Sequence, residues 1–536
     1  MDIRRTIMAI CISVIILIGW QQLAVHMGWA PDPALQQQQQ QQQQDTAQPT
    51  AQTPVQAPTP MAPLPAFQPS PGRDVVVETP LYKAVFYSGG GLLRSFELKK
   101  YKDSIGSDSL PLQLISPEAI SKAPMGVILD GMASWSDSSW ELEGGDLNLA
   151  AGQTGKVKFI GEANGTRLVR ELTFDADRYS LKENLTIQSE QPRNLRLAFT
   201  MSTGKLHADG AGYDLTRIAY DQAGSFTSED DEKTLLAGLD PTGEFSWASI
   251  MSNYFLAAVI PHATSGTLKL KLEDGAYRLA VEKTGIAVAP GQDANFAATY
   301  YIGPKDQKML DAEPGNLGTA IDYGMFSIVA RPLIAMLHFF YSYVGNWGVA
   351  IIFLTIVIKI LLWPLSYKSY KSMEQLKKLQ PMMAKLKEKY GDNKEAMNRE
   401  MMQLYKTYKI NPASGCLPIL VQLPVFIGLY QGLLGSIELR HAAFIYYLPF
   451  TDMLWLADLS VKDPFYITPI VMGLTMFLQQ KLTPAAGDPT QQKIMMFMPL
   501  IFMVMFINFP SGLVLYWLTN NVISIGQQWW QLRHVK

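Results

Sequence analysis

The feature that most constrains this chain is the uneven distribution of its apolar segments. One long apolar segment lies at 7–25 and several more lie within 323–530, whereas the residues between these regions contain no comparable run. A helix needs about 20 predominantly apolar residues to cross the hydrocarbon core of a bilayer. The sequence therefore predicts a membrane protein with a large water-exposed domain between its first apolar segment and the others.

The N-terminal apolar segment, 7–25, follows a pair of arginines. It is longer than the apolar core of a usual signal peptide, and no small-residue cleavage site follows it. We expect residues 1–25 to form an uncleaved transmembrane anchor whose basic end lies in the cytoplasm. Nine consecutive glutamines at 36–44 and a stretch rich in Pro, Ala, Thr and Gln come next. Because such residues bury little apolar surface, 26–72 are predicted to be a disordered tether.

The stretch 73–322 contains many short apolar or alternating segments between turns rich in Gly, Asp and Asn, for example 167–174 and 179–187. Alternation of apolar and polar residues is typical of strands that have one face in a core. Many short strands of this kind indicate an antiparallel β-sandwich domain. The cysteines of the chain, Cys11 and Cys416, lie outside this stretch, so no disulfide can form within it.

Residues 323–345 include an apolar segment that is long enough to span a bilayer, but Arg331 and Pro332 lie near its middle. An arginine at the centre of a spanning helix costs about 2.5–3.5 kcal/mol on insertion scales. Because Arg331 and His338 can share one helical face, we expect an amphipathic helix that lies along the membrane surface. Five apolar segments within 346–536 are better candidates for spans: 349–365, 417–434, 465–478, 494–509 and 513–525.

The charges of two loops predict the orientation of these spans. The loop 367–411 contains eleven Lys or Arg and five Asp or Glu, whereas 438–464 contains two and four. Cytoplasmic loops carry the excess of Lys and Arg, so we place the first loop in the cytoplasm and the second outside. Six spans, counted with the anchor, satisfy both placements and leave both termini in the cytoplasm and 73–322 outside. A seventh span at 323–345 would reverse the two loops. The expected fold class is a six-span α-helical membrane core with a large outer β-domain.

Lys359 is the most unusual residue of the predicted spans. It lies about nine residues, or ~13 Å, from the polar end of its segment at 366–368, which is close to the middle of the bilayer. An ionisable side chain at this depth normally faces a water-filled cavity or a partner. Thr355 lies one turn away on the same face. The later spans contain no Asp or Glu at mid-depth. We therefore expect a polar pocket whose anionic partner arrives with a substrate, the alternatives being a lysine that snorkels to the surface or a structural hydrogen-bond network.

The other predicted spans supply polar side chains that can join this pocket. They are Gln422, Thr475, Gln479, Tyr516, Thr519, Asn520 and Ser524. Tyr516, Asn520 and Ser524 recur every four residues and therefore share one face of a helix.

The basic loop 367–411 has a helical apolar pattern of its own on either side of Gly391–Asn393. Apolar residues recur every three or four positions at Met373, Leu376, Leu379, Met383, Leu386, Tyr390, Met397, Met401, Leu404 and Tyr408. This pattern predicts an antiparallel helical hairpin with a coiled-coil-like seam, kinked at Pro381. Its basic surface suits anionic lipid headgroups or ribosomal RNA. A hairpin that only links two spans is the alternative.

Motifs for catalysis are missing from the sequence, which has no G-x-x-x-x-G-K-S/T, no H-E-x-x-H and no G-x-S-x-G. Two cysteines and six scattered histidines do not form a metal site. We therefore expect the chain not to be an enzyme and to bind no cofactor or metal.

Several long stretches of the C-terminal part carry a specific resemblance. They are NWGVAIIFLTIVIKILLWPL (346–365), LQPMMAKLKEKYGDNKEAMNREMMQLYK (379–406), INPASGCLPILVQLPVFIGLY (410–430), DPTQQKIMMFMPLIF (488–502) and FPSGLVLYWLTNN (509–521). With the N-terminal anchor and the outer β-domain, the chain resembles the YidC/Oxa/Alb family of membrane protein insertases, in the form found in Gram-negative bacteria.

The resemblance implies a five-helix core that encloses a hydrophilic groove, open to the cytoplasm and to lipid, and an outer β-supersandwich. The family's positive groove residue, commonly Arg, falls on Lys359, which keeps the charge but lacks the planar guanidinium fork. Other groove positions fall on or near Thr355, Tyr516 and Trp517, and a Tyr-Tyr pair is common at the last two. The expected substrate-binding groove therefore consists of Lys359, Thr355, Gln422, Tyr516, Trp517 and Asn520.

By the same resemblance, the chain is expected to insert hydrophobic segments of nascent proteins into the inner membrane and to help them fold, alone or with the Sec translocon. The implied partners are nascent membrane proteins, the Sec translocon, ribosomes with the signal-recognition pathway, and membrane lipids. The sequence ends in QLRHVK without a long basic tail, so we do not expect a tail-based ribosome contact. One competing function is a secondary transporter or channel, although the sequence shows no inverted repeats. Another is an envelope enzyme whose sandwich binds sugar, but a sandwich fold alone does not establish such a function.

Overall fold

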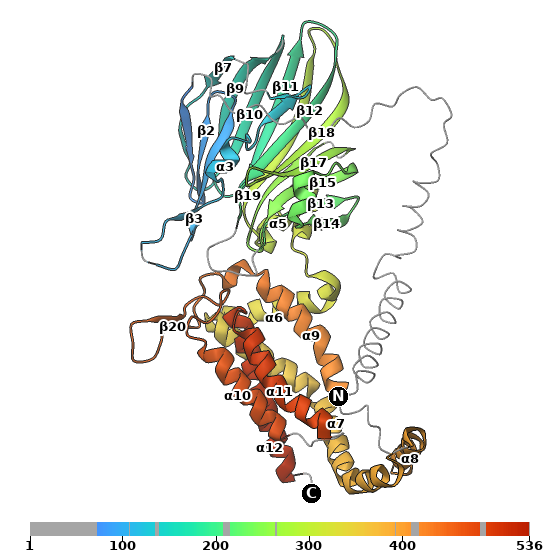
Figure 1. Ribbon diagram of the computed structural model, residues 1–536. Helices are drawn as coiled ribbons and strands as arrows, with labels where there is room; N and C mark the ends of the chain where they lie inside the picture. The colour runs from blue at the N-terminus through green and yellow to red at the C-terminus, as the bar shows by residue number, and fades with distance from the viewer. Residues whose placement is uncertain are drawn as a thin grey trace, which may run out of the picture. The chain divides into compact units, whose positions relative to one another are not determined.

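The computed structural model describes residues 72–106, 108–133, 139–163, 165–206, 215–262, 265–391, 393–408, 417–482 and 489–534. The predicted anchor at 1–25, the tether up to residue 71 and both cysteines lie outside these residues. Up to residue 304 the described chain consists mainly of strands, and beyond it mainly of helices (Figure 1).

The first sheet contains five strands, namely β1 (Asp74–Glu78), β2 (Tyr82–Tyr87), β3 (Leu92–Lys102), β4 (Pro111–Gln113) and β8 (Leu147–Asn148). Their order is β4-β3-β2-β1-β8, and all neighbours are antiparallel except β1 and β8. Buried and more exposed residues alternate along β1, as expected of a strand with one face in a core.

The second sheet contains fourteen strands: β5 (Val127–Leu129), β6 (Met132–Ala133), β7 (Ser139–Glu143), β9 (Thr154–Ala163), β10 (Thr166–Asp175), β11 (Ser180–Ser189), β12 (Arg193–Thr203), β13 (Arg217–Gln222), β14 (Ser225–Glu229), β15 (Thr242–Met251), β16 (Phe255–Pro261), β17 (Ser265–Glu273), β18 (Ala276–Val288) and β19 (Asp293–Pro304). The path runs β6-β5-β12-β18-β17-β15-β16-β19-β11-β10-β9-β7, with β13 and β14 attached at β15. Its strand pairs are antiparallel.

The two sheets share one apolar core. Phe86 of β2 and Phe174 of β10, for example, have ring centroids 5.5 Å apart in an edge-to-face arrangement. Short helices lie in the connections at α3 (Pro117–Ile120), α4 (Glu232–Ala237) and α5 (Gln307–Asp311). The predicted large antiparallel β-domain is thus confirmed.

A buried ion pair lies within the second sheet, and its arginine also reaches the first sheet. Arg170 of β10 contacts Glu183 of β11 with Nε 2.6 Å from Oε1, and both side chains are fully buried. The same guanidinium donates to the carbonyl of Gly90, in the turn between β2 and β3, and to that of Met125. These acceptors satisfy the buried charge of Arg170. Because Gly90 lies in a turn of the first sheet and Arg170 in the second sheet, the bond between them holds the two sheets together.

The helical part consists of α6 (Ser327–Val344), α7 (Trp347–Tyr390), α8 (Lys394–Thr407), α9 (Leu417–Leu434), α10 (Ile467–Leu482), α11 (Pro489–Phe506) and α12 (Ser511–His534). Short 3-10 turns lie at η1 (Pro314–Ala320), η2 (Gly324–Phe326) and η4 (Ile437–Leu439), and β20 (Ile445–Tyr447) pairs with β21 (Leu454–Leu456). Two of the described helices are long and apolar enough to span a membrane, at Gly324–Val344 and Trp347–Leu376. Shorter apolar helices lie at Leu420–Leu434 and Met496–Phe506.

The predicted span 349–365 and the first arm of the predicted hairpin are one continuous helix, α7. Asn346 caps its start by accepting a hydrogen bond from the backbone N–H of Val349. The helix contains both Pro364 and Pro381 and ends only at Tyr390. The boundary near residue 366 is therefore a change from apolar to basic composition and not a break in the backbone.

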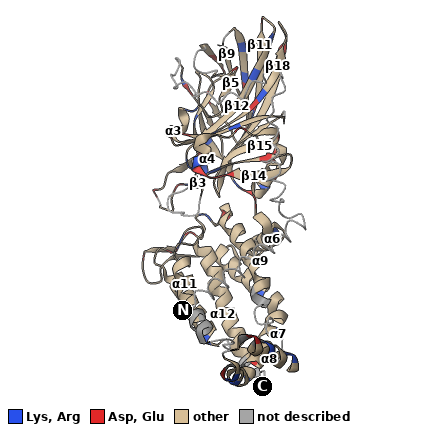
Figure 2. Cartoon of the chain, turned by 45° about the vertical axis from the view of Figure 1, so that its right-hand side comes forward, with Lys and Arg blue, Asp and Glu red and all other residues tan. Residues whose placement is uncertain are grey.

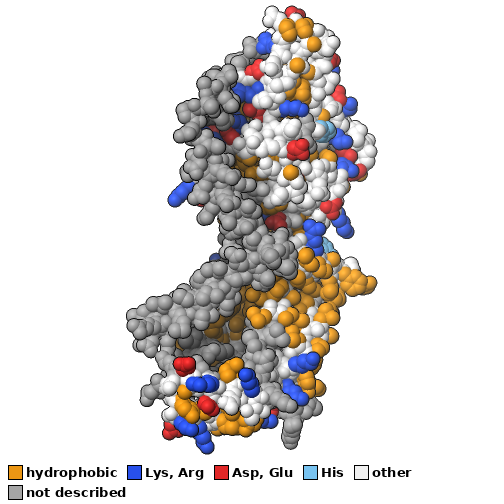
Figure 3. Space-filling view, turned by 90° about the vertical axis from the view of Figure 1, so that its right-hand side faces the viewer, with side chains coloured by type: hydrophobic (Ala, Val, Ile, Leu, Met, Phe, Trp, Pro, Cys, Tyr) orange, Lys and Arg blue, Asp and Glu red, His pale blue; other side chains and the backbone are white. Residues whose placement is uncertain are grey.

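The helices pack around a second apolar cluster that includes Leu354 of α7, Leu429 of α9 and Val514 of α12. Helix α12 contacts α7, α9 and α10, while α6 contacts α7 and α9. The opposite faces expose large apolar side chains, such as Ile360 of α7 and Leu474 of α10. In Figure 3 hydrophobic side chains cover much of the visible helical surface. This is the surface expected of helices that face lipid.

Helix α6 has one apolar face turned into this packing and one mixed face turned outward. Leu333, Ile334 and Leu337 are buried. Arg331 is exposed and donates from Nε to the hydroxyl of Ser327. The outward face also exposes Ile328, Phe339 and Tyr343, so it is mixed rather than polar, and the position of α6 along the membrane surface stays a prediction.

Candidate functional site

The candidate site begins with Lys359 on α7, whose side chain is only 7% exposed. Its Nζ donates a hydrogen bond to the Oγ of Ser524 on α12, at 2.8 Å. Ser524 in turn donates to the backbone carbonyl of Asn520, one turn earlier on α12, at 2.7 Å. The ammonium therefore contacts a neutral hydroxyl, and no carboxylate lies within 4.0 Å of it among the described residues.

The sequence of α7 explains why Lys359 faces inward. Its neighbours Ile360 and Leu361 are 62% and 69% exposed, so the outer face of the helix is apolar. Ile358 is buried in the packing between helices, and Thr355 lies one turn before Lys359 and is fully buried. The hydroxyl of Thr355 donates to the carbonyl of Ile351 at 2.7 Å, so its hydrogen bond is made within α7 itself.

A second hydrogen bond extends the polar contacts to α9. The Nε2 of Gln422 donates to the Oδ1 of Asn520 at 2.7 Å. Asn520 is 8% exposed and lies one turn from Ser524. Lys359, Ser524, Asn520 and Gln422 therefore form one connected set of hydrogen-bonded residues from three helices, which we call the polar chain.

Tyr516 and Trp517 are adjacent in the sequence but belong to different surroundings. Tyr516 is buried on the side of α12 that carries Asn520, and its hydroxyl, which faces Gln422, makes no hydrogen bond of ordinary geometry with the described residues. Trp517 instead packs on aromatic rings of α9 and α11, with centroids 4.6 Å from Phe426 and 5.3 Å from Phe506. The structure thus brings Tyr516 to the polar chain and places Trp517 in an aromatic cluster.

Three glutamines continue the polar face of α12 and were not among the predicted site residues. Gln527, Gln528 and Gln531 are all less than 8% exposed. Gln528 donates from Nε2 to the hydroxyl of Tyr370 on α7 at 3.0 Å. The amide of Gln527 has no hydrogen-bond partner among the described residues. Their spacing from Ser524 is the signal that reveals them, since residues three, four and seven positions apart lie on one helical face.

No group of three or more His, Cys, Asp or Glu among the described residues is placed to hold a metal ion. The chemistry that the polar chain offers is hydrogen bonding and one positive charge inside an apolar bundle. Such a site can take up a polar or anionic group that would otherwise have to enter lipid without a partner.

Comparisons with known proteins identify the family of the chain. The family model described as "60Kd inner membrane protein" matches residues 339–536, and the model of the YidC periplasmic domain matches residues 74–336. The membrane protein insertase YidC of Nitratidesulfovibrio vulgaris is 55% identical over 535 residues, which cover 99% of this chain and 100% of that protein. The chain belongs to the YidC family of membrane protein insertases. This membership confirms the resemblance that was inferred from the sequence stretches.

Other YidC relatives and solved structures extend the comparison. The membrane protein insertase YidC of Lawsonia intracellularis is 50% identical over 539 residues, or 99% of this chain and 100% of that protein. An active YidC insertase crystal structure with the first transmembrane domain resolved covers 87% of this chain and 94% of its own, with 16% identity and a TM-score of 0.37. A putative aldose 1-epimerase from Escherichia coli K12 covers 43% and 99%, with 11% identity and a TM-score of 0.29. Both TM-scores are below 0.5, so the YidC membership rests on the sequence matches.

In this YidC-family chain the basic loop folds as α8 against the end of α7. Its small core contains the buried Leu376 and Leu379 with Leu404 and Met383 packed on them. The hydroxyl of Tyr405 contacts the sulfur of Met383 at 3.7 Å. The ribbon of this hairpin carries several blue segments, which mark Lys and Arg, together with some red ones in Figure 2. The apolar seam is therefore shorter than the sequence pattern, because only two of its residues are buried.

Proposed function

We propose that this chain inserts hydrophobic segments of nascent proteins into the inner membrane, and that the polar chain of Lys359, Ser524, Asn520 and Gln422 receives the polar end of the inserting segment. The observation that carries the proposal is that three helices direct hydrogen-bonding side chains to one buried place inside the bundle. The function is binding without covalent chemistry, and no cofactor takes part.

The polar chain lowers the cost of moving a hydrophilic tail part of the way across the membrane. A charged residue at the bilayer centre costs about 2.5–3.5 kcal/mol on insertion scales. A hydrogen bond to a charged group contributes about 1.5–3 kcal/mol. A carboxylate on the tail replaces the neutral Ser524 as the partner of Lys359 and forms a stronger, charge-assisted hydrogen bond. The driving force is burial of the segment's apolar side chains in lipid, at about 25 cal/mol per Å².

The exposed apolar faces supply the route by which the segment leaves the bundle. Leu423 of α9, Leu474 of α10 and Ile501 of α11 are each at least 50% exposed in the absence of a membrane. Met496 and Met505 of α11 are also exposed, and their flexible thioethers adapt to side chains of many shapes. A segment that places its tail at the polar chain can slide along these faces into lipid.

The topology we propose has six spans with both termini in the cytoplasm, the β-domain in the periplasm and α6 along the outer membrane surface. The charge difference between 367–411 and 438–464 supports it. The exposed Arg331 of α6 and the aromatic residues Phe339 and Tyr343 on the same helix suit an interfacial position. The proposed domains are the anchor 1–25, the tether 26–72, the β-domain 73–322, the interfacial helix 323–345 and the insertase core 346–536.

The proposed partners differ in what supports them. Nascent membrane proteins follow from the family. The Sec translocon, ribosomes and the signal-recognition pathway are proposed from resemblance, and the basic hairpin of α7 and α8 offers a surface for RNA or anionic lipid.

Disulfide crosslinking to stalled nascent chains tests the function. Cys11 and Cys416 are first replaced by Ser, and a single cysteine is placed at Ser524 or, as the matched control, at the exposed Val522 of the same helix. A cysteine in the polar tail of a stalled substrate should crosslink to position 524 and not to 522. Equal crosslinking at both positions would exclude the polar chain as the receiving site. Solute flux through reconstituted liposomes, with no substrate insertion, would instead support a transporter.

A further inference from the structure

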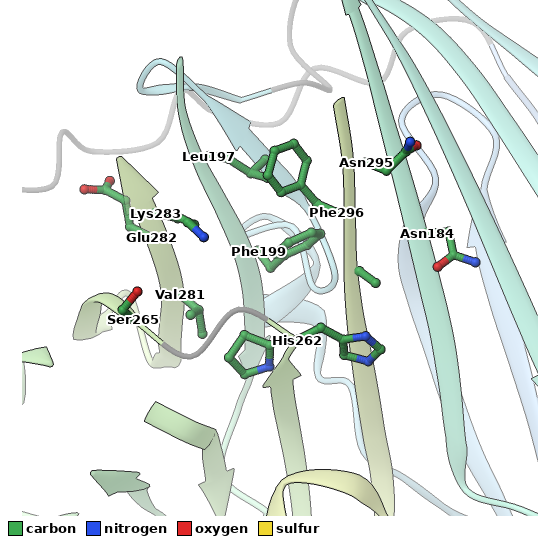
Figure 4. Close-up of a pocket in the computed structure, with 12 residues that line it drawn as sticks. Asn184, Leu197, Phe199, His262, Ser265, Val281, Glu282, Lys283, Asn295 and Phe296 are labelled. Atoms are coloured by element: carbon green, nitrogen blue, oxygen red, sulfur yellow. The ribbon is translucent and has the colours of Figure 1, made fainter. Parts of the chain in front are cut away.

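A separate cavity of about 540 Å³ opens within the β-domain, between the end of β18 and the beginning of β19. Figure 4 shows Leu197, Phe199 and Phe296 lying close together in it, with Lys283 on one side and Asn295 on the other. Its volume falls within the usual range of about 300–1,000 Å³ for binding sites.

The strand order explains why the cavity exists. Strands β18 and β19 follow each other in the chain, but β17, β15 and β16 lie between them in the sheet. The pairing of β17 with β18 ends at Thr267 and Glu282. The pairing of β16 with β19 ends at Pro261 and Ala298. Beyond these pairs β18 and β19 continue with no strand paired between them among the described residues. The gap between them holds the cavity, and we call this gap the wedge.

Each side of the wedge is an unpaired strand edge. Residues 283–288 of β18 pair only with β12, and residues 293–297 of β19 pair only with β11, among the strands that the structure describes. Unpaired backbone groups at such an edge are a template for a further strand. This wedge therefore has the hydrogen-bonding surface that an extended peptide recognises.

The backbone of β19 shows which groups are available. The N–H of His262, just after β16, donates to the carbonyl of Ala297 at 3.2 Å. Backbone groups on one side of an antiparallel strand recur at every second residue. The N–H and C=O of Asn295 consequently point to the same side as that carbonyl, into the wedge. A peptide that continues the line of β16 beyond His262 meets these groups in register.

The side chains around the wedge give the peptide its chemistry. Phe199 is nearly buried and forms an apolar floor with Leu197, and Phe296 is partly exposed above it. The carboxylate of Glu282 lies 3.7 Å from Arg196 and is thereby neutralised. Lys283 has no ion-pair partner among the residues described, so the wedge presents a net positive charge.

We propose that this wedge binds an extended segment of a translocated polypeptide, which pairs with the free edge of β19, places an apolar side chain against Phe199 and Phe296, and places an acidic side chain near Lys283. The inference rests on the proposed function, because the segment is the exported part of an insertion substrate. A sugar or lipid lacks the alternating N–H and C=O groups that the edge of β19 offers.

Photo-crosslinking in the full-length protein tests the proposal. A benzophenone side chain replaces Asn295 or, as the control, the exposed Arg167 of β10. The probe is a single-span substrate whose exported loop carries alternating valine and glutamate, compared with the same loop carrying proline at every second position. We expect several-fold more crosslinking from position 295 than from 167, and loss of it with the proline loop, because proline has no N–H to donate.

A wedge-filling variant gives a second readout. Ala297→Trp occupies the cavity and should reduce crosslinking from position 295, whereas Arg167→Trp, exposed on β10 and outside the lining, should not. Equal crosslinking from 295 and 167, or equal crosslinking with both loops, overturns the proposal. In the same reaction, disulfide crosslinking of a cysteine at position 524 shows whether the substrate reaches the polar chain. Crosslinks at position 524 without crosslinks at position 295 overturn this inference alone. Loss of both crosslinks contradicts the proposed function.

Discussion

The ammonium of Lys359 donates a hydrogen bond to the hydroxyl of Ser524 over 2.8 Å, across the contact between α7 and α12. A neutral hydroxyl stabilises a positive charge less than a carboxylate does. Lys359 is therefore held in place in the resting protein and can still exchange Ser524 for an anionic group of a substrate.

Ser524→Ala should lower the stability of the protein, because it leaves a buried ammonium without this partner. The expected loss is about 1–3 kcal/mol, which is the usual cost of an unsatisfied buried group. Thermal unfolding in detergent measures it. The control is Ser342→Ala on the exposed face of α6, which should change stability by less than about 0.5 kcal/mol. Equal melting temperatures for the two variants would mean that the Lys359–Ser524 bond contributes nothing.

Arg170→Met should strongly destabilise the β-domain, because it leaves the carboxylate of Glu183 buried and unpaired. Breaking one side of a buried pair costs about 3–5 kcal/mol. The matched control is Lys156→Met, which removes an exposed ion pair with Glu171 on the same strand as Arg170. That change should cost less than about 1 kcal/mol. Denaturant unfolding compares the two, and similar losses would contradict the role of Arg170 in joining the sheets.

Glu313, which lies after the last strand of the β-domain, gives a pH-dependent prediction. Burial raises the pKa of its carboxyl above the ordinary value of 4.5, against the opposing effects of Ser180 and Arg178. The folded protein therefore binds this proton more tightly than the unfolded chain does. The carboxyl of Glu313 stabilises the fold fully below its ordinary pKa, and this stabilisation is lost as the pH rises through the raised pKa. Glu313→Gln should match the parent protein in stability near pH 4 and exceed it near pH 7. A gain that is the same at both pH values would contradict this assignment.

The proposed topology predicts which positions an impermeant thiol reagent reaches from outside. Single cysteines at Lys100 and Asp452 should react in spheroplasts, and one at Glu395 should react only after the membrane is opened. All three positions are exposed, so accessibility to solvent does not separate them. Reaction at 395 in sealed spheroplasts would rule out a cytoplasmic hairpin.

Local patterns in the sequence were sufficient to predict part of this fold. Alternation along segments such as 167–174 predicted strands, and the depth of Lys359 in an apolar run predicted a buried charge. The four-residue spacing of Tyr516, Asn520 and Ser524 placed them on one face of a helix, and they do lie together on α12.

Long-range packing was beyond the reach of these patterns. The partner of Lys359 is 165 positions away, and only the contact of α7 with α12 identifies it. The wedge between β18 and β19 depends on which strands lie between them in the sheet, which no local pattern encodes. Gln527 and Gln531 lie beyond the predicted span, which ends at residue 525, although their spacing from Ser524 places them on its polar face.

The central claim is that the charge of Lys359 receives an anionic group of the inserting substrate. It is tested most directly by reconstituted insertion of one substrate with either an acidic or a neutralised tail, at matched amounts of protein. The parent protein and Lys359→Arg should insert the acidic tail efficiently. Lys359→Glu should impair the acidic tail much more than the neutral one, because repulsion replaces attraction. Equal insertion of both tails by the parent protein and by Lys359→Glu would contradict the account and leave Lys359 as a structural residue.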